Sequence, residues 1–219
     1  MATDYLIAGG TGLVGSEIVR QLLANEGTRK VITLGRRAAD FSDKRLTHLP
    51  YDFSGRPQKS ALPSNCAAIC TLGTTIKQAG SQEAFRKVDF DYVLNFAEIA
   101  RDIKASSLHV VTAHGAAKSS LIFYNRVKGE IEEAIQRIGL AEVHIYRPSL
   151  LIGNRKEHRA GEGFAAAAAK ALSPVFKLPG LSSVQPTPAD HLAAFIIRQA
   201  SSVSPGNHVH SNAEIMSDR

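Results

Sequence analysis

Short apolar runs alternate with amphipathic stretches over most of the chain. The apolar runs predict β-strands at residues 5–8, 31–34, 46–49, 67–70, 108–112 and 143–146. The first, second and fifth of these runs are apolar on both faces, as strands buried in a parallel sheet are. The stretches at 13–24, 84–104 and 123–138 carry apolar residues at helical spacing and predict helices. This alternation predicts an α/β fold, a Rossmann doubly wound parallel sheet.

The pattern changes after Pro148. Residues 154–163 are polar and rich in glycine, and an alanine run at 165–169 predicts the start of a helix. Prolines then interrupt the chain up to a further predicted helix at 188–199, and residues 207–210 predict a last edge strand.

The length and composition favour one globular domain. The 219 residues, 44% of them hydrophobic, can bury a substantial core. We expect a single domain over residues 1–219, with a small C-terminal substrate lobe inserted at residues 151–187. Within that lobe, the segment 154–163 is expected to be mobile without ligand and to border the substrate opening.

Composition also bears on location and partners. No apolar run is long enough to span a bilayer, and no basic stretch precedes the first apolar residues, so we predict neither a membrane segment nor a signal peptide. Cys66 and Cys70 cannot form a disulfide framework and share one face of a strand, which favours a core position over a metal site and a reduced, cytoplasmic setting. His208 and His210 also share a strand face and are expected to lie on an exposed edge.

The formal charge of +6 is spread along the chain. Nucleic-acid binding would need a concentrated basic stripe, so we do not expect it. The alternatives are an ordinary solvated surface and a field that attracts an anionic ligand.

A glycine-rich turn follows the first predicted strand and opens the first predicted helix. Its glycines form the pattern Gly-x-x-Gly-x-x-Gly. Glycines let a pyrophosphate approach backbone N–H groups, and a helix N-terminus attracts negative charge. We therefore expect a dinucleotide to bind at Gly9, Thr11, Gly12, Leu13, Val14 and Gly15. A glycine-rich turn without a ligand is the alternative.

The end of the second predicted strand indicates which dinucleotide binds. NAD-specific domains place an acidic residue there, against the ribose hydroxyls. This chain has Arg36 and Arg37 instead. Guanidinium suits a ribose 2′-phosphate, so we expect NADP(H), unless both arginines are solvated loop residues. Further cofactor contacts are expected after the third and fourth strands, from Asp52 and Phe53 beside the adenine and from Leu72, Gly73 and Thr74 along the cofactor.

Tyr124 and Lys128 are the candidate catalytic pair. Their i,i+4 spacing in a predicted helix after the fifth strand puts both side chains on one face. A lysine ammonium stabilises a neighbouring phenolate, so this tyrosine can exchange a proton with a substrate oxygen while a nicotinamide exchanges hydride with the carbon. Lys128 is also expected to bind the cofactor, by helping to hold the nicotinamide ribose. The Thr112 hydroxyl, at the end of the fifth strand, is expected to hydrogen-bond the same substrate oxygen. An ordinary surface pair on a helix is the alternative.

Several stretches of the chain carry a family resemblance. Among them are Leu72-Gly73-Thr74-Thr75, Phe85-Arg86-Lys87-Val88-Asp89, Val127-Lys128-Gly129-Glu130 and Tyr146-Arg147-Pro148. Together they resemble the short-chain dehydrogenase/reductase superfamily in its atypical or extended branch, and within it the Tat-interacting-protein-type NAD(P)-binding oxidoreductases. The resemblance implies a Rossmann fold, NADP(H) binding, and backbone at Arg147 and Pro148 near the nicotinamide. The chain departs from the family at Thr112-Ala113, where a pair of serines is usual, and at Asp89, where many members carry asparagine.

Two functions remain open. The first is an NADP-dependent oxidoreductase that acts on a small carbonyl or alcohol substrate, and the second is an NADP(H)-binding regulatory or redox-sensor protein with little turnover. Retention of Tyr124 and Lys128 favours the first, whereas Thr112-Ala113 keeps the second open. The sequence leaves the substrate, the reaction direction and the oligomeric state undecided, with a homodimer as one candidate.

Overall fold

A computed structural model of the chain describes residues 3–153 and 185–218. Within them, seven strands form one sheet in the order β3-β2-β1-β4-β5-β6-β9, and every neighbouring pair is parallel. The strands are β1 (Thr3–Ala8), β2 (Thr28–Gly35), β3 (Leu46–Pro50), β4 (Ala67–Cys70), β5 (Ser107–Val111), β6 (Glu142–Arg147) and β9 (Gly206–Ser211). The predicted Rossmann fold is therefore confirmed. The strand order reverses between β1 and β4, which is where such sheets bind ligands at their carboxyl edge.

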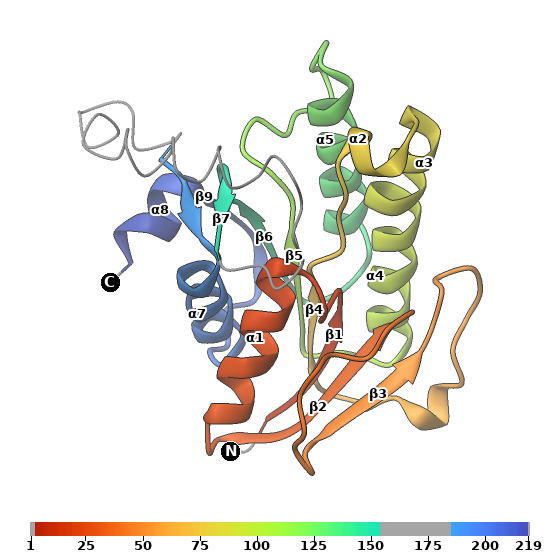
Figure 1. Cartoon of the computed structure of the whole chain (residues 1–219), viewed down its shortest axis with the longest axis vertical. Helices are drawn as coiled ribbons and strands as arrows, with labels where there is room; N and C mark the ends of the chain where they lie inside the picture. Colours follow the sequence, from red (N-terminus) through yellow and green to blue (C-terminus); the bar gives the residue numbers. More distant parts are fainter. Residues whose placement is uncertain (1–2, 154–184, 219) are drawn as a thin grey trace.

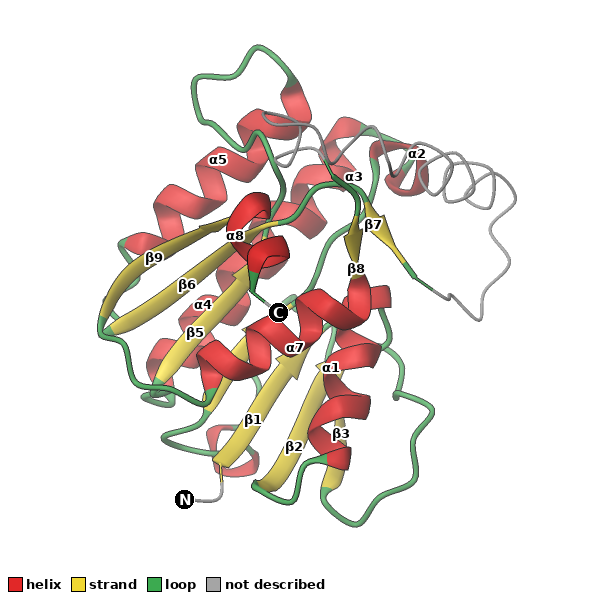
Figure 2. Cartoon of the chain, turned by 90° about the vertical axis from the view of Figure 1, so that its left-hand side faces the viewer, coloured by secondary structure: helices red, strands yellow, loops and turns green. Residues whose placement is uncertain are grey.

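Helices cover both faces of the sheet (Figures 1 and 2). Side chains alternate along each strand, so Leu6 and Ala8 of β1 join one hydrophobic core, while Tyr5 and Ile7 join the other. The first core lies against α4 (Val93–Asp102) and α5 (Phe123–Gln136), and the second against α1 (Leu13–Ala24), α7 (Ala189–Ala200) and α8 (Asn212–Ser217).

The long helix predicted at 84–104 consists of three joined parts. The first is α3 (Gln82–Arg86), the second is a π-helical turn η2 (Lys87–Tyr92), and the third is α4. A π turn adds a residue to the helical repeat and so changes where the following side chains point. Asp89 lies inside this turn and is fully buried.

Short elements complete the described chain. These are η1 (Lys59–Ala61), α2 (Ile76–Ala79) and the parallel pair of β7 (Leu151–Ile152) and β8 (Thr187–Pro188). Most of the predicted substrate lobe, including the segment 154–163 and the helix start at 165–169, lies outside the described residues. No helix in residues 3–153 and 185–218 is both long and apolar enough to cross a bilayer.

The structure corrects one expectation about the edge strand β9 and bears out another about the cysteines. His210 is not on an exposed edge: it is only 6% exposed, because α7 and α8 cover that face of β9, with the Phe195 ring 5.3 Å away. Its strand neighbour His208 is half-buried. Cys66 and Cys70 both lie in the core, as predicted, and burial raises the pKa of each thiol to about 12.

Candidate functional site

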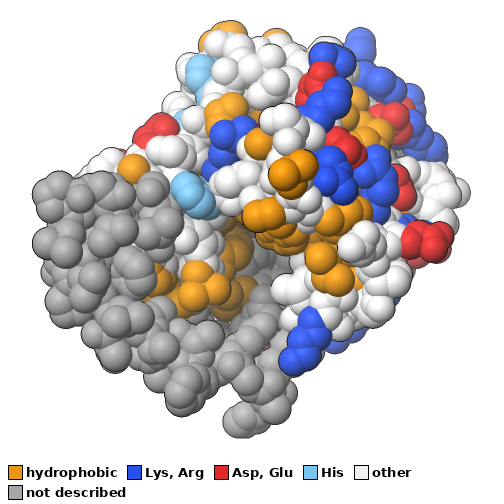
Figure 3. All heavy atoms as spheres, turned by 90° about the horizontal axis from the view of Figure 1, so that it is seen from above, with side chains coloured by type: hydrophobic (Ala, Val, Ile, Leu, Met, Phe, Trp, Pro, Cys, Tyr) orange, Lys and Arg blue, Asp and Glu red, His pale blue; other side chains and the backbone are white. Residues whose placement is uncertain are grey.

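The predicted site residues come from strand ends, from the loops after them and from the first turns of α1 and α5, at the carboxyl edge of the sheet. Seen from above in Figure 3, this face is hollowed, and hydrophobic side chains line the hollow. Exposed apolar side chains also gather on loops at this edge, Leu121 and Ile122 before α5 and Leu150 after β6.

The glycine turn between β1 and α1 is too tightly packed for side chains. A Cβ on Gly15 would lie 2.1 Å from the Gly9 carbonyl oxygen, and Gly9 itself has a φ of +85°, which favours glycine. The Gly12 N–H donates to the Gly9 carbonyl oxygen at 2.9 Å, which closes the turn. Gly12 caps α1 without a side-chain hydrogen bond, so the first N–H groups of the helix face the turn uncapped. This arrangement fits a pyrophosphate, and exposed Thr11 stands beside it.

Lys128 and Asp89 form a buried ion pair. The Lys128 Nζ lies 2.7 Å from Asp89 Oδ1, with the two side chains 4% and 1% exposed. The other carboxylate oxygen accepts the Thr74 N–H at 2.9 Å. Gly73 passes directly over the pair, because a Cβ there would lie 3.4 Å from Asp89 Oδ1. The loop after β4, in which Leu72 packs half-buried against the core, is thus joined to α5.

Burial and the charge of the partner shift the pKa of each member of this pair in opposite directions. Burial raises the pKa of Asp89, and the Lys128 ammonium opposes that shift only in part. Burial alone would lower the pKa of Lys128, but the charges of Asp89 and Tyr124 outweigh it and leave that pKa raised. Lys128 is therefore held charged, with Asp89 as its counter-ion.

Tyr124 lies in the first turn of α5, one turn before Lys128. Its ring packs against Phe85 of α3, with centroids 5.3 Å apart, and it is half-buried. The helix thus brings the predicted catalytic pair together at the edge where the glycine turn lies.

Thr112 is bound to a second, partly buried ion pair, which joins Glu132 to Arg147. Its Oγ1 donates to Glu132 Oε1 at 2.6 Å, and Arg147 Nε donates to both oxygens of the same carboxylate, at 3.0 and 3.2 Å. A hydroxyl has one proton, so in this arrangement Thr112 can accept a hydrogen bond from a substrate but not donate one. Glu132 is 3% exposed and was not found from the sequence, although its i,i+4 spacing from Lys128 places it on the same helix face.

The remaining predicted cofactor residues are spread along the same edge. Arg36 and Arg37 are exposed at the end of β2. The Asp52 carboxylate accepts the Ser54 N–H and hydroxyl, and these hydrogen bonds lower its pKa. Phe53 is buried among other aromatic rings of the core, with Tyr51 at 4.8 Å and Tyr92 at 5.7 Å. Val14 is buried and Leu13 half-buried in α1, and buried Pro148 accepts the His114 N–H at 2.8 Å.

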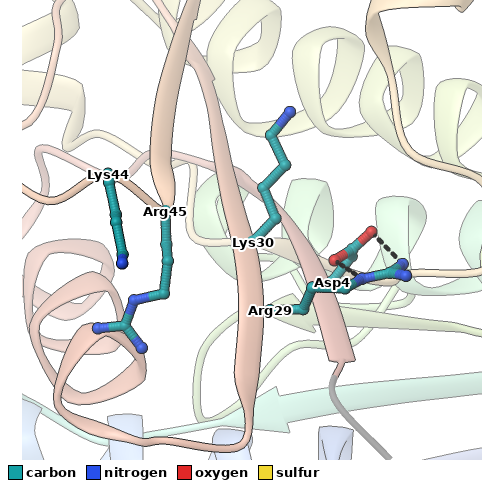
Figure 4. A pocket seen from close by; sticks show the side chains of 5 residues that line it. All are labelled: Asp4, Arg29, Lys30, Lys44 and Arg45. Atoms are coloured by element: carbon teal, nitrogen blue, oxygen red, sulfur yellow. Dashed lines mark hydrogen bonds and ion pairs between the residues drawn. The ribbon is translucent and has the colours of Figure 1, made fainter.

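A basic hollow at the opposite edge of the sheet does not form a comparable site. It lies at the amino ends of β1, β2 and β3 and is lined by Asp4, Arg29, Lys30, Lys44 and Arg45. Figure 4 shows that these side chains point in different directions. Asp4 pairs with Arg29 at 2.5 Å, and Arg45 pairs with Asp43 at 2.9 Å. The positive charges therefore do not converge on one point.

Comparison with known proteins supports the family resemblance. Residues 5–118 match the model of the NAD dependent epimerase/dehydratase family. The rat protein HTATIP2 is 31% identical over 166 residues, which cover 74% of this chain and 68% of the rat protein. The Candida albicans protein FMP52, mitochondrial, is 35% identical over 165 residues, which cover 73% of this chain and 72% of the fungal protein.

Solved structures with low sequence identity share the fold. MoeE5 in complex with UDP-glucose and NAD superposes with a TM-score of 0.71 at 16% identity, covering 98% of this chain and 80% of that chain. The UDP-N-acetylglucosamine 4-epimerase from Methanobrevibacter ruminantium gives a TM-score of 0.72 at 14% identity, covering 95% and 76%.

The comparisons correct the expected location. A cytoplasmic setting was predicted from the cysteines and the N-terminus, and this prediction is wrong, because fungal relatives carry the word mitochondrial in their names. The two core cysteines, from which a reduced setting was expected, do not distinguish one reducing compartment from another.

Proposed function

Because the chain belongs to the NAD dependent epimerase/dehydratase family, we propose that it is an NADP-dependent oxidoreductase, which transfers hydride to or from a small carbonyl or alcohol substrate. The observation that carries this proposal is the placement of Tyr124 and Lys128 one helical turn apart on α5, at the sheet edge where the glycine turn lies. A protein that only bound a dinucleotide would need the glycine turn but not this pair.

Each site residue at the carboxyl edge of the sheet would have its own role in such a reaction. The nicotinamide, when bound, supplies or accepts the hydride. The Tyr124 hydroxyl holds or takes the proton at the substrate oxygen, and Phe85 fixes its ring. The Lys128 ammonium, kept charged by Asp89, favours the phenolate during transfer. Thr112 is placed to accept a hydrogen bond from an alcohol substrate.

The proposal is tested by a screen of the purified protein with NADPH against a panel of carbonyl compounds, and with NADP⁺ against the matching alcohols. NADPH oxidation that depends on the carbonyl supports it. Tight NADPH binding without turnover of any compound would contradict it.

Cofactor choice gives a separate prediction. Replacing both Arg36 and Arg37 by alanine should weaken NADPH binding by about 10- to 150-fold, because a charged contact to the 2′-phosphate contributes about 1.5–3 kcal/mol. NADH affinity should stay the same, since NADH lacks that phosphate. Titration calorimetry of both cofactors measures the effect, and Arg20→Ala on the exposed face of α1 is the matched control. Equal affinity of the unaltered protein for NADH and NADPH would contradict the prediction.

A redox-sensor function is the second candidate. It is favoured by the fact that Lys128 is paired with Asp89 while the Thr112 proton is directed to Glu132. A sensor would bind NADP(H) and change its contacts with a partner while turning over little substrate. Its signature is an NADPH-dependent change in partner binding that survives Tyr124→Phe.

A further inference from the structure

A row of histidine rings crosses three parallel strands on the sheet face that α7 and α8 cover. His109, His144 and His208 stand at paired positions on β5, β6 and β9, and Tyr146 pairs with His210 two residues further along. The His144 ring lies 4.7 Å from the His109 ring and 4.7 Å from the His208 ring, close to parallel with both. The cluster is on the opposite sheet face from α5 and takes no part in the proposed chemistry.

Four members of this region form a continuous chain of hydrogen bonds. His144 Nε2 lies 3.1 Å from Glu142 Oε1, and His144 Nδ1 lies 2.9 Å from His210 Nε2. His210 Nδ1 then lies 2.7 Å from Glu214 Oε1. The Glu142 side chain is 5% exposed and the Glu214 side chain is 49% exposed, so the chain leads from the interior to the surface.

This chain of hydrogen bonds needs more protons than two neutral histidines supply. It contains three short contacts, from Glu142 to His144, from His144 to His210 and from His210 to Glu214. Each contact needs one hydrogen between its two heavy atoms, and a neutral imidazole carries only one N–H. Two neutral rings between two carboxylates therefore leave two lone pairs facing each other at one contact. All three contacts form only when the chain holds one extra proton.

Burial disfavours the inner ring, His144, as the holder of that proton. Burial lowers the pKa of His144, Glu142 opposes the shift, and His210 and His208 add to it. His109 is kept neutral by burial, which lowers its pKa well below the usual value. Both inner rings are thus disfavoured as holders of an extra proton, and the outer contact of the chain is the one that His210 makes with the Glu214 carboxylate.

Other elements around His210 contribute little free charge. From β6 it faces the Tyr146 ring at 4.9 Å, and from α7 the apolar Phe195 ring at 5.3 Å. Arg198 on α7 is paired with Asp218, and His191 on α7 bonds the Ile215 carbonyl oxygen at 2.7 Å. His208 bonds the Ser204 carbonyl oxygen at 2.8 Å. Within residues 3–153 and 185–218, the carboxylates that hydrogen-bond the two rings of this chain are those of Glu142 and Glu214.

Asn212, two residues after His210, connects this chain of hydrogen bonds to the candidate site. Asn212, at the start of α8, is fully buried. Its Oδ1 accepts the Ser149 N–H at 3.1 Å and the Thr187 hydroxyl at 2.5 Å, and its Nδ2 donates to the Gln185 carbonyl oxygen at 2.8 Å. Ser149 belongs to the turn after β6, and the last residue of β6, Arg147, is bound to Glu132 of α5. Through Asn212, α8 holds this turn and the strand β8 together.

We propose that the chain from Glu142 through His144 and His210 to Glu214 is a proton-held latch, which fixes α8 and, through Asn212, the turn after β6 beside the Tyr124–Lys128 site. Because the closed latch holds one more proton than two neutral histidines, its own contribution to stability is present at mildly acid pH and is lost as the pH rises, whereas the burial that lowers the pKa of His144 works against it. Its effect on NADPH binding rests on the proposed function, whereas the latch itself does not.

Two substitutions of Glu214 distinguish the effect of the extra proton from the effect of the contact between Glu214 and His210. In Glu214→Gln the side-chain amide donates to the lone pair of neutral His210, so the third hydrogen bond no longer needs the extra proton. Glu214→Ala deletes the contact. Without cofactor, the Tm of the unaltered protein should fall by about 2–6 °C between about pH 6 and pH 8.5 relative to Glu214→Gln, which should show no such loss. Glu214→Ala should have the lower Tm at both values. His208 lies outside this chain of hydrogen bonds, so His208→Asn is the matched control and should keep the pH dependence of Tm.

Nitrogen NMR of the histidine rings gives a direct readout. At about pH 6 the His144 and His210 rings should together carry three protons on their nitrogens, one for each contact of the chain. A total of only two protons on these two rings at that pH, or the same pH dependence of Tm in the unaltered protein and Glu214→Gln, would overturn the latch.

Hydrogen exchange and cofactor titration test the coupling to the site. Exchange of the Ser149 N–H should be faster in Glu214→Ala, and NADPH affinity should drop by about 3- to 10-fold. Unchanged Ser149 protection in Glu214→Ala would overturn the coupling. If Ser149 responds while the unaltered protein binds no NADPH, the latch stands and the proposed function fails.

Discussion

Tyr124→Phe is expected to slow hydride transfer by about 100-fold or more, which is the usual contribution of a positioned general acid or base. The substitution removes the hydroxyl that exchanges a proton with the substrate oxygen. It keeps the ring that packs against Phe85, so α5 and its contact with α3 should be unaffected. NADPH affinity should hardly change, because the glycine turn and the arginines at the end of β2 are untouched. Single-turnover measurement with a substrate from the carbonyl screen isolates the chemical step.

Two further variants make this result specific. Tyr5→Phe removes a hydroxyl of the same kind, which lies 3.3 Å from Ser201 Oγ in the other core, and should leave transfer unchanged. Thr112→Val should slow transfer less than Tyr124→Phe, because Thr112 is bound to Glu132 and is placed to orient the substrate rather than to exchange its proton. Equal rates in Tyr124→Phe and the unaltered protein would remove Tyr124 from the mechanism.

The periodicity of the sequence was enough to predict the sheet and most of its helices. Buried parallel strands need apolar side chains on both faces, and that requirement is local, so each strand core was visible in its own residues. The glycine turn was visible for the same reason, since its close packing is between neighbouring elements. The π-helical turn at Lys87–Tyr92 was not predicted, because its apolar residues continue a pattern that an ordinary helix shares.

The partners of the site residues could not be predicted, because they depend on long-range packing. Glu132 contacts Thr112 and Arg147 only because α5 lies across β5 and β6. His210 looked like an exposed edge residue because the sequence of β9 does not show that α7 and α8 cover it. Asn212 carries no local signal, since Ser149, Gln185 and Thr187, to which it hydrogen-bonds, lie in two distant segments.

The ion pair of Lys128 and Asp89 belongs to the candidate site and also affects the stability of the fold. Both charges are almost completely removed from water, with 4% and 1% of their side chains exposed. Removing water from a charge is costly, and the attraction between the partners offsets that cost only while both are present. The pKa of Asp89 is already raised by burial with the ammonium in place, so loss of the ammonium should raise it further.

Lys128→Met should therefore destabilise the protein by about 3–5 kcal/mol, far more than the loss of a surface pair, because it leaves Asp89 buried and unpaired. The loss should be largest above the raised pKa of Asp89 and smaller at lower pH, where the carboxyl is neutral in the folded state. Adding Asp89→Asn should recover most of it, since the amide oxygen still accepts the Thr74 N–H. Arg20→Met, which breaks an exposed pair with Glu17, should cost under about 1 kcal/mol. Denaturant unfolding of all four proteins measures these differences. A loss in Lys128→Met no larger than that in Arg20→Met would show that the buried pair does not stabilise the fold.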